Sequence, residues 1–149
     1  MTNADVARLF DELADIMEIA GENFFKIKAY RNASGIISQL DRDLNKLPSE
    51  KLNEIAGIGK AISEKIQTAL NTGSFPTLEK WRQNDFASFR PLLLIPGLTM
   101  RQLRAIIKSN NLTSIADLKK LVANNSVNSI DKLDENTKQS LANFLERMP

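Results

Sequence analysis

The 149-residue sequence contains no cysteine and no histidine. Without cysteine the chain forms no disulfides and performs no thiol catalysis, and without either residue it has no zinc site of the cysteine–histidine type. The lack of histidine also excludes acid–base chemistry that depends on an imidazole. We expect the protein to require no cofactor for its main activity.

Long apolar runs are absent as well. No stretch approaches the roughly 18 residues that a membrane-spanning helix needs. Residues 1–20 are acidic, unlike a signal peptide. We therefore expect a soluble protein of the cytoplasm with no membrane partner, nucleoid-associated if it is bacterial. We also expect a monomer.

Charge of one sign is not in large excess, since the formal net charge is only +2. Residues 1–85 hold 11 Lys and Arg against 13 Asp and Glu, a net of −2, and residues 86–149 hold 9 against 5, a net of +4. A protein that binds nucleic acid by non-specific electrostatics alone is usually more basic. Any affinity for a polyanion should therefore be modest.

Helical periodicity runs through most of the chain. One apolar stripe extends from Val6 to Ala20, and Gly21 follows it as a helix end. The stripe expected for the second helix, which Asn23 caps, consists of Phe24, Ile27, Tyr30, Ala33, Ile36, Ile37 and Leu40. Because strand patterning is nearly absent, the sequence predicts an all-α fold.

The most informative segment is Gly57-Ile58-Gly59, between a short apolar run and an amphipathic helix that begins at Lys60. Glycine tolerates the unusual backbone angles of a tight turn between two helices. The first amides of the following helix are unpaired and lie at the positive end of its dipole, where a phosphate oxygen binds well. The pattern predicts a helix-hairpin-helix motif that binds one nucleic-acid strand through residues 57–60. The alternative is a structural turn without a ligand.

A second hairpin follows about 40 residues later, where Leu92–Thr99 repeats the order of apolar helix end, glycine turn and new helix. Gly97 keeps the first glycine of the motif. Thr99 stands where the first motif has its second glycine, and its hydroxyl can cap the next helix. The loop either binds a phosphate, with Arg101 and Arg104 on the helix behind it, or serves only as scaffold.

The two hairpins divide the chain into two small helical lobes, each built around one helix-hairpin-helix motif. The second motif is degenerate because it lacks one glycine. A looser polar stretch around residues 83–88 joins the lobes. We therefore expect one domain over residues 1–84 and another over residues 85–149.

With these motifs in place, the chain resembles the N-terminal region of family X DNA polymerases, the polymerase beta family. The resemblance covers essentially the whole chain, and its first segment is closest to bacterial and archaeal members. It implies a lyase-type domain followed by a fingers subdomain. The palm of the family, which carries the metal-binding aspartates of polymerisation, has no counterpart here, so we do not expect the chain to polymerise by itself. The matching segments are Gly21–Arg31, Ala56–Ile66, Thr72-Gly73 and Leu92–Leu98.

The resemblance implies 5′-deoxyribose-phosphate lyase activity in base excision repair. In lyase-competent members a lysine attacks the sugar aldehyde, forms a Schiff base and releases the phosphate end by β-elimination. That lysine falls on Lys65. The 5′-phosphate contacts of the family fall on Lys26 and Tyr30. Two further basic positions fall on Asn53 and Ala61, which are not basic.

Neighbouring residues extend this expected site. Lys60 lies next to the second non-basic position and can take its place. Tyr30 and Arg31 can stack on a base or reach a phosphate, or Tyr30 only completes the apolar stripe. The resemblance further implies a monovalent cation, Na+ or K+, held by main-chain carbonyls of the first hairpin. Those carbonyls belong to Asn53, Ile55 and Ile58.

The sequence leaves three functions open. The first is lyase activity through Lys65, for which the structural alternative is an ordinary surface lysine. The second is a non-catalytic module that binds DNA at gaps, nicks or 5′-phosphate ends and recruits other repair proteins. The third is a protein-interaction adaptor that uses the hairpins only for helix packing. Whether the chain is an enzyme therefore stays open.

Overall fold

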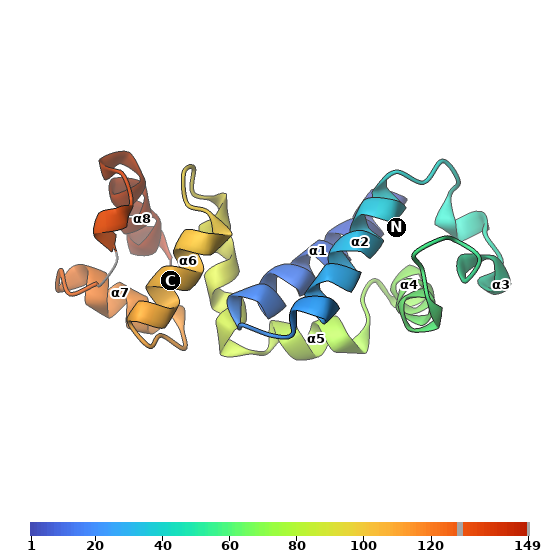
Figure 1. Cartoon of the computed structure of the whole chain (residues 1–149), viewed down its shortest axis with the longest axis horizontal. Coiled ribbons are helices and arrows are strands. Elements are labelled where there is room, and N and C mark those ends of the chain that lie inside the picture. Colours follow the sequence, from blue (N-terminus) through green and yellow to red (C-terminus); the bar gives the residue numbers. More distant parts are fainter. Residues whose placement is uncertain (128–129, 149) are drawn as a thin grey trace. The chain divides into compact units, whose positions relative to one another are not determined.

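The computed structural model describes residues 1–127 and 130–148, and every regular element in that range is helical (Figure 1), which confirms the all-α prediction. The chain divides into two compact units, Met1–Gln83 and Asn84–Pro149. The first unit contains α1 (Asn3–Ile19), α2 (Phe24–Ser38), the 3-10 helix η1 (Leu44–Lys46), α3 (Ser49–Leu52), α4 (Lys60–Thr72) and α5 (Pro76–Arg82). The second contains the 3-10 helix η2 (Asp85–Leu94), α6 (Met100–Ser109), α7 (Ile115–Ala123), the 3-10 helix η3 (Ile130–Lys132) and α8 (Glu135–Arg147).

The core of the first unit lies between α1 and α2, which pack along each other. α1 begins with a capping box, in which the Thr2 hydroxyl accepts from the Asp5 amide and the Asp5 carboxylate accepts from the Thr2 amide. The Phe10 ring lies 5.2 Å from that of Phe75 and 6.0 Å from that of Tyr30. Burial of these large side chains holds α2 and the start of α5 against α1.

The apolar stripe expected for α2 is partly wrong. Ile27, Ala33 and Ile37 are buried, but Phe24 is 67% exposed and its neighbour Phe25 is 78% exposed. Phe24 is the first residue of α2, and in that first turn Ile27 is the apolar residue that is buried. Helical periodicity shows which residues share a face, but it does not show where the neighbouring helices stop.

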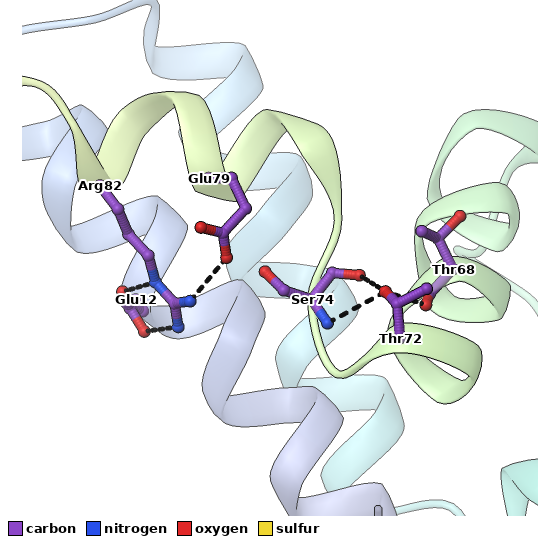
Figure 2. Close-up of polar contacts among 6 residues, drawn as sticks. All are labelled: Glu12, Thr68, Thr72, Ser74, Glu79 and Arg82. Carbon is purple, nitrogen blue, oxygen red and sulfur yellow. Dashed lines mark hydrogen bonds and ion pairs between the residues drawn. The ribbon is translucent and has the colours of Figure 1, made fainter.

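Polar contacts tie the end of α5 to α1 and order the link that precedes α5 (Figure 2). The Arg82 guanidinium donates two hydrogen bonds to the Glu12 carboxylate of α1, at 2.6 and 2.8 Å, and one to Glu79 at 2.8 Å. At the other end, the Thr72 hydroxyl of α4 lies 2.8 Å from the main-chain oxygen of Ser74. The end of α5 is therefore tied to α1, and the Thr72–Ser74 contact orders the short link that precedes α5.

The second unit packs η2, α6, α7 and α8 around a core of its own. Its fully buried side chains include Phe89, Leu92, Leu103, Leu118 and Leu141. Every one of these elements contributes at least one of them. Among the residues that the structure describes, no helix combines the length and apolarity needed to cross a membrane.

Candidate nucleic-acid interface

The first hairpin is a tight turn between α3 and α4. Gly57 has a φ of +88°, in the left-handed region that favours glycine, and the Ile58 amide donates to the Ile55 carbonyl at 2.9 Å. Ile58 is buried, whereas Gly57 and Gly59 are exposed. A β-carbon at Gly57 would collide with the Ile36 side chain of α2. The fold itself therefore requires glycine at position 57.

Gly59 differs, because no contact with the described residues requires a glycine there. It caps α4 with φ −84° and ψ −180°, an extended backbone that any residue adopts. A β-carbon built at Gly59 meets no other atom within 4 Å. The space at the start of α4 is therefore open, and a ligand backbone can approach it.

The amides at the start of α4 are unpaired. Those of Lys60, Ala61 and Ile62 donate no hydrogen bond to any described residue, and no side chain caps the helix. The first main-chain hydrogen bond of α4 is donated by the Ser63 amide to the Gly59 carbonyl, at 2.9 Å. The free donors lie at the positive end of the α4 dipole, with the exposed Lys60 side chain beside them. This combination favours binding of a phosphate oxygen.

The second hairpin repeats the backbone of the first. Gly97 also has a φ of +88°, and the Leu98 amide donates to the Ile95 carbonyl at 3.1 Å. The repeat of motifs in the sequence is thus a repeat of the same turn. A β-carbon at Gly97 would collide with Thr137 of α8, so packing requires this glycine too.

The two hairpins differ at the helix start. In the second, the Thr99 hydroxyl accepts from the Gln102 amide at 3.1 Å, and the Thr99 amide donates to the Gln102 side chain at 2.9 Å. The cap expected from Thr99 is present, and it uses a donor that the first hairpin leaves open. Arg101 and Arg104 are exposed on α6. A DNA contact of the second hairpin would therefore depend on these side chains more than on its amides.

Lys65 of α4 lies against Tyr30 of α2. Its Nζ is 5.9 Å from the centroid of the Tyr30 ring, a cation–π contact, and both side chains are half-buried. Burial raises the pKa of the Tyr30 phenol, so its hydroxyl stays a neutral donor at physiological pH. Tyr30 also lines a surface hollow with Lys26, one helical turn earlier. Tyr30 is thus a neighbour of both lysines that the family resemblance links to lyase chemistry, although Lys65 is not among the residues that line the hollow.

Arg31 faces α1 instead of an open surface. Its Nη2 lies 2.7 Å from the Asp15 carboxylate and 3.2 Å from the Glu18 carboxylate. The two acids neutralise the guanidinium and tie α2 to α1. Because the charge of Arg31 is already compensated within the protein, we leave it out of the proposed DNA contacts.

An exposed aromatic pair at the start of α2 did not follow from the sequence. The rings of Phe24 and Phe25 lie 5.9 Å apart, edge to face at 71°, and the exposed Lys26 follows them. Exposed aromatic rings beside a basic side chain are typical of surfaces on which single-stranded bases stack.

The main-chain oxygens expected to hold Na+ or K+ lie in the turn of the first hairpin, between α3 and α4. Those of Asn53 and Ile58 accept no hydrogen bond from a described residue, and that of Ile55 accepts one from the Ile58 amide. Neutral oxygen donors suit a hard cation. The donor set therefore fits a monovalent ion, and its binding stays a prediction.

Comparisons with known proteins agree with this geometry. A family model described as a helix-hairpin-helix domain matches residues 1–75, about half of the chain. The chain therefore belongs to the helix-hairpin-helix family.

Within that class, the chain is similar to the DNA polymerase/3′-5′ exonuclease PolX of Bacillus subtilis (strain 168), with 30% identity over 119 residues. The matched segment makes up 80% of this chain and 20% of PolX, so the chain spans only a small part of that relative. These findings confirm the resemblance to the N-terminal region of family X DNA polymerases, and they support DNA as the partner.

Proposed function

We propose that this chain binds DNA at gaps, nicks and 5′-phosphate ends, with the first hairpin as its main phosphate contact. The observation that carries the proposal is the open, uncapped start of α4 next to Gly59. A phosphate oxygen would accept hydrogen bonds from the free amides there, and Lys60 would add a charge. Main-chain donors read no base, so this contact would be independent of DNA sequence.

Other exposed side chains would extend the contact. Arg101 and Arg104 of α6 would bind further phosphates. Phe24 and Phe25 would stack on bases, which a gap leaves unpaired and an intact duplex does not. We therefore expect gapped DNA to be preferred over intact duplex.

We further propose lyase chemistry at Lys65. The Nζ atom would attack the C1′ aldehyde of a 5′-deoxyribose phosphate and lose water to form an imine. Loss of a C2′ proton would then break the bond from C3′ to its oxygen, so that the downstream DNA leaves with a 5′-phosphate. The contact of Lys65 with Tyr30, and the hollow that Tyr30 shares with Lys26, support a site for the sugar and its phosphate.

Two alternatives would use the same surfaces. A non-catalytic module would bind the same DNA and recruit other repair proteins, with Lys65 only as a contact. A protein-interaction adaptor would bind no DNA at all. The open amides of α4 favour DNA binding over the adaptor, because helix packing alone does not need them to be free.

The test is binding to gapped, nicked and intact duplexes, each with and without a 5′-phosphate, across a salt series. We expect gapped DNA to bind most tightly, with a slope of log K against log salt of about −3 to −4, as about four phosphate contacts would give. Undetectable binding, or binding that salt does not weaken, would contradict the proposal and favour the adaptor. Borohydride trapping then separates an enzyme from a simple DNA-binding module.

A further inference from the structure

The exposed face of α6 carries positive charge from its first turn to its last. Arg101, Arg104 and Lys108 are exposed, and none of them forms an ion pair with a described residue. The helix contains no aspartate or glutamate. Because positions i, i+3 and i+7 share one side of a helix, the three side chains form a single row, here called the α6 stripe.

The packing of α6 fixes the direction in which the stripe points. Leu103, Ile106 and Ile107 are buried in the core of the second unit, so the opposite side of the helix faces solvent. At 1.5 Å per residue, Arg101 and Lys108 lie about 10 Å apart along the helix axis. One strand of B-DNA presents a phosphate about every 3.4 Å of its axis, so the stripe spans about three phosphates. Its length and charge therefore suit a DNA backbone that runs beside the helix.

The start of α6 is less open to a phosphate than the start of α4. Its capping box uses the Thr99 amide, which donates to the Gln102 side chain at 2.9 Å, and the Gln102 amide, which donates to the Thr99 hydroxyl at 3.1 Å. The corresponding amides of the first hairpin, those of Gly59 and Ile62, donate to no described residue. Two donors that the first hairpin offers to a ligand are therefore already used in the second.

A carboxylate also lies close to the second hairpin. Gly97 lies against Thr137, whose amide donates to the Asp134 carboxylate at 2.7 Å. This negative charge would repel a phosphate at the turn. Lys108 stands at the opposite end of α6, beyond the reach of a phosphate bound at the helix start. A contact of Lys108 with DNA therefore distinguishes binding along α6 from binding at its end.

We propose that the α6 stripe is a second DNA site, which binds the backbone of a duplex side-on whether or not that duplex contains a gap. The inference rests on the proposed function. It assigns a phosphate contact to Lys108, and it makes Thr99 the residue that keeps the second hairpin from binding as the first one does. Cationic side chains on phosphates read neither a base nor a strand end. The first unit would then select the gap, and the second would bind the flanking duplex.

The experiment measures dissociation constants for a gapped and an intact duplex of equal length across a salt series, by anisotropy of labelled DNA. The stripe is tested with Lys108→Gln and with a triple variant that combines Arg101→Gln, Arg104→Gln and Lys108→Gln. Lys120→Gln is the matched control, because it removes an exposed lysine of α7 in the same unit. Thr99→Gly gives the second hairpin the cap residue of the first, and glycine costs little at an N-cap. Circular dichroism checks that each variant is folded.

We expect Lys108→Gln to weaken the binding of both duplexes about threefold, as the loss of one exposed charge contact would. The slope of log K against log salt should become shallower by about 1 in Lys108→Gln and by about 2 to 3 in the triple variant. The ratio of the two dissociation constants should not change in either. Lys120→Gln should leave the slope as it is. Thr99→Gly should tighten the binding of both duplexes, because two freed donors add a phosphate contact.

Several results would overturn the inference while the proposed function stands. If the unaltered chain binds gapped DNA and the triple variant binds it equally well, the α6 stripe is not a DNA site and is left for an acidic protein partner. Equal losses in Lys108→Gln and Lys120→Gln would indicate diffuse attraction without a site. A stripe variant that weakens only gapped DNA would contradict the side-on duplex contact, and unchanged binding by Thr99→Gly would contradict the role of the cap. Failure of the unaltered chain to bind either duplex would instead overturn the proposed function, and the inference with it.

Discussion

Lys65→Ala is expected to abolish borohydride trapping of this chain on DNA with a 5′-deoxyribose phosphate end. Trapping requires an imine between Nζ and the sugar carbon, and alanine has no amine to form one. The covalent complex, measured on a denaturing gel, should therefore fall to background. Binding to the same DNA should weaken only modestly, because Lys65 is half-buried and contributes one charge among several.

Two controls separate the chemistry from DNA contact. Lys60→Ala removes an exposed lysine of the same helix, and it should lower affinity while trapping per bound complex stays unchanged. Lys65→Arg keeps a cation over the Tyr30 ring without a nucleophile, and it should bind without trapping. Equal trapping by Lys65→Ala and the unaltered chain would exclude Lys65 as the nucleophile.

Gly59→Asp is expected to raise the stability of the first unit and to lower its affinity for DNA. An aspartate in this N-cap position accepts from the free amides of Ala61 or Ile62 and complements the helix dipole, for a gain of about 0.5 kcal/mol. Its carboxylate would then occupy the place proposed for the phosphate and repel it, so affinity for gapped DNA should fall about tenfold. Thermal melting and DNA binding on the same sample measure both effects.

A variant that becomes more stable while its DNA affinity falls has lost a contact with DNA, and its fold is not damaged. Gly59→Asn keeps the cap without the charge, so it should stabilise similarly and lose less affinity. Gly57→Ala should lose both stability and affinity, because a φ of +88° strains a residue with a side chain and the new β-carbon would displace the tip of the Ile36 side chain. A Gly59→Asp chain that is more stable but binds DNA unchanged would contradict the role of the α4 amides.

The hairpins could be predicted from sequence because their causes are local. A glycine with positive φ, a buried apolar residue after it and a helix start all lie within a few residues of one another. The cap by Thr99 follows in the same way, since a hydroxyl at that position needs only the backbone of its own helix. Local rules of this kind also predict the all-α fold.

Features that depend on distant segments could not be predicted. The sequence pattern does not distinguish Gly57 from Gly59, but in the fold Gly57 has a positive φ and lies against the Ile36 side chain, while Gly59 has an extended backbone and open space beside it. The sequence left Arg31 available for a base or a phosphate, whereas in the fold two carboxylates of α1 lie beside its guanidinium.

The most direct test of the central claim, that free amides of α4 bind a DNA phosphate, is an NMR titration of the isotope-labelled chain with a gapped duplex. We expect the amide signals of Lys60, Ala61 and Ile62 to shift first and furthest. The amide signal of Gln102, which already donates to the Thr99 hydroxyl, should shift less. If the duplex binds while the three α4 amides keep their positions, the first hairpin is not the phosphate contact.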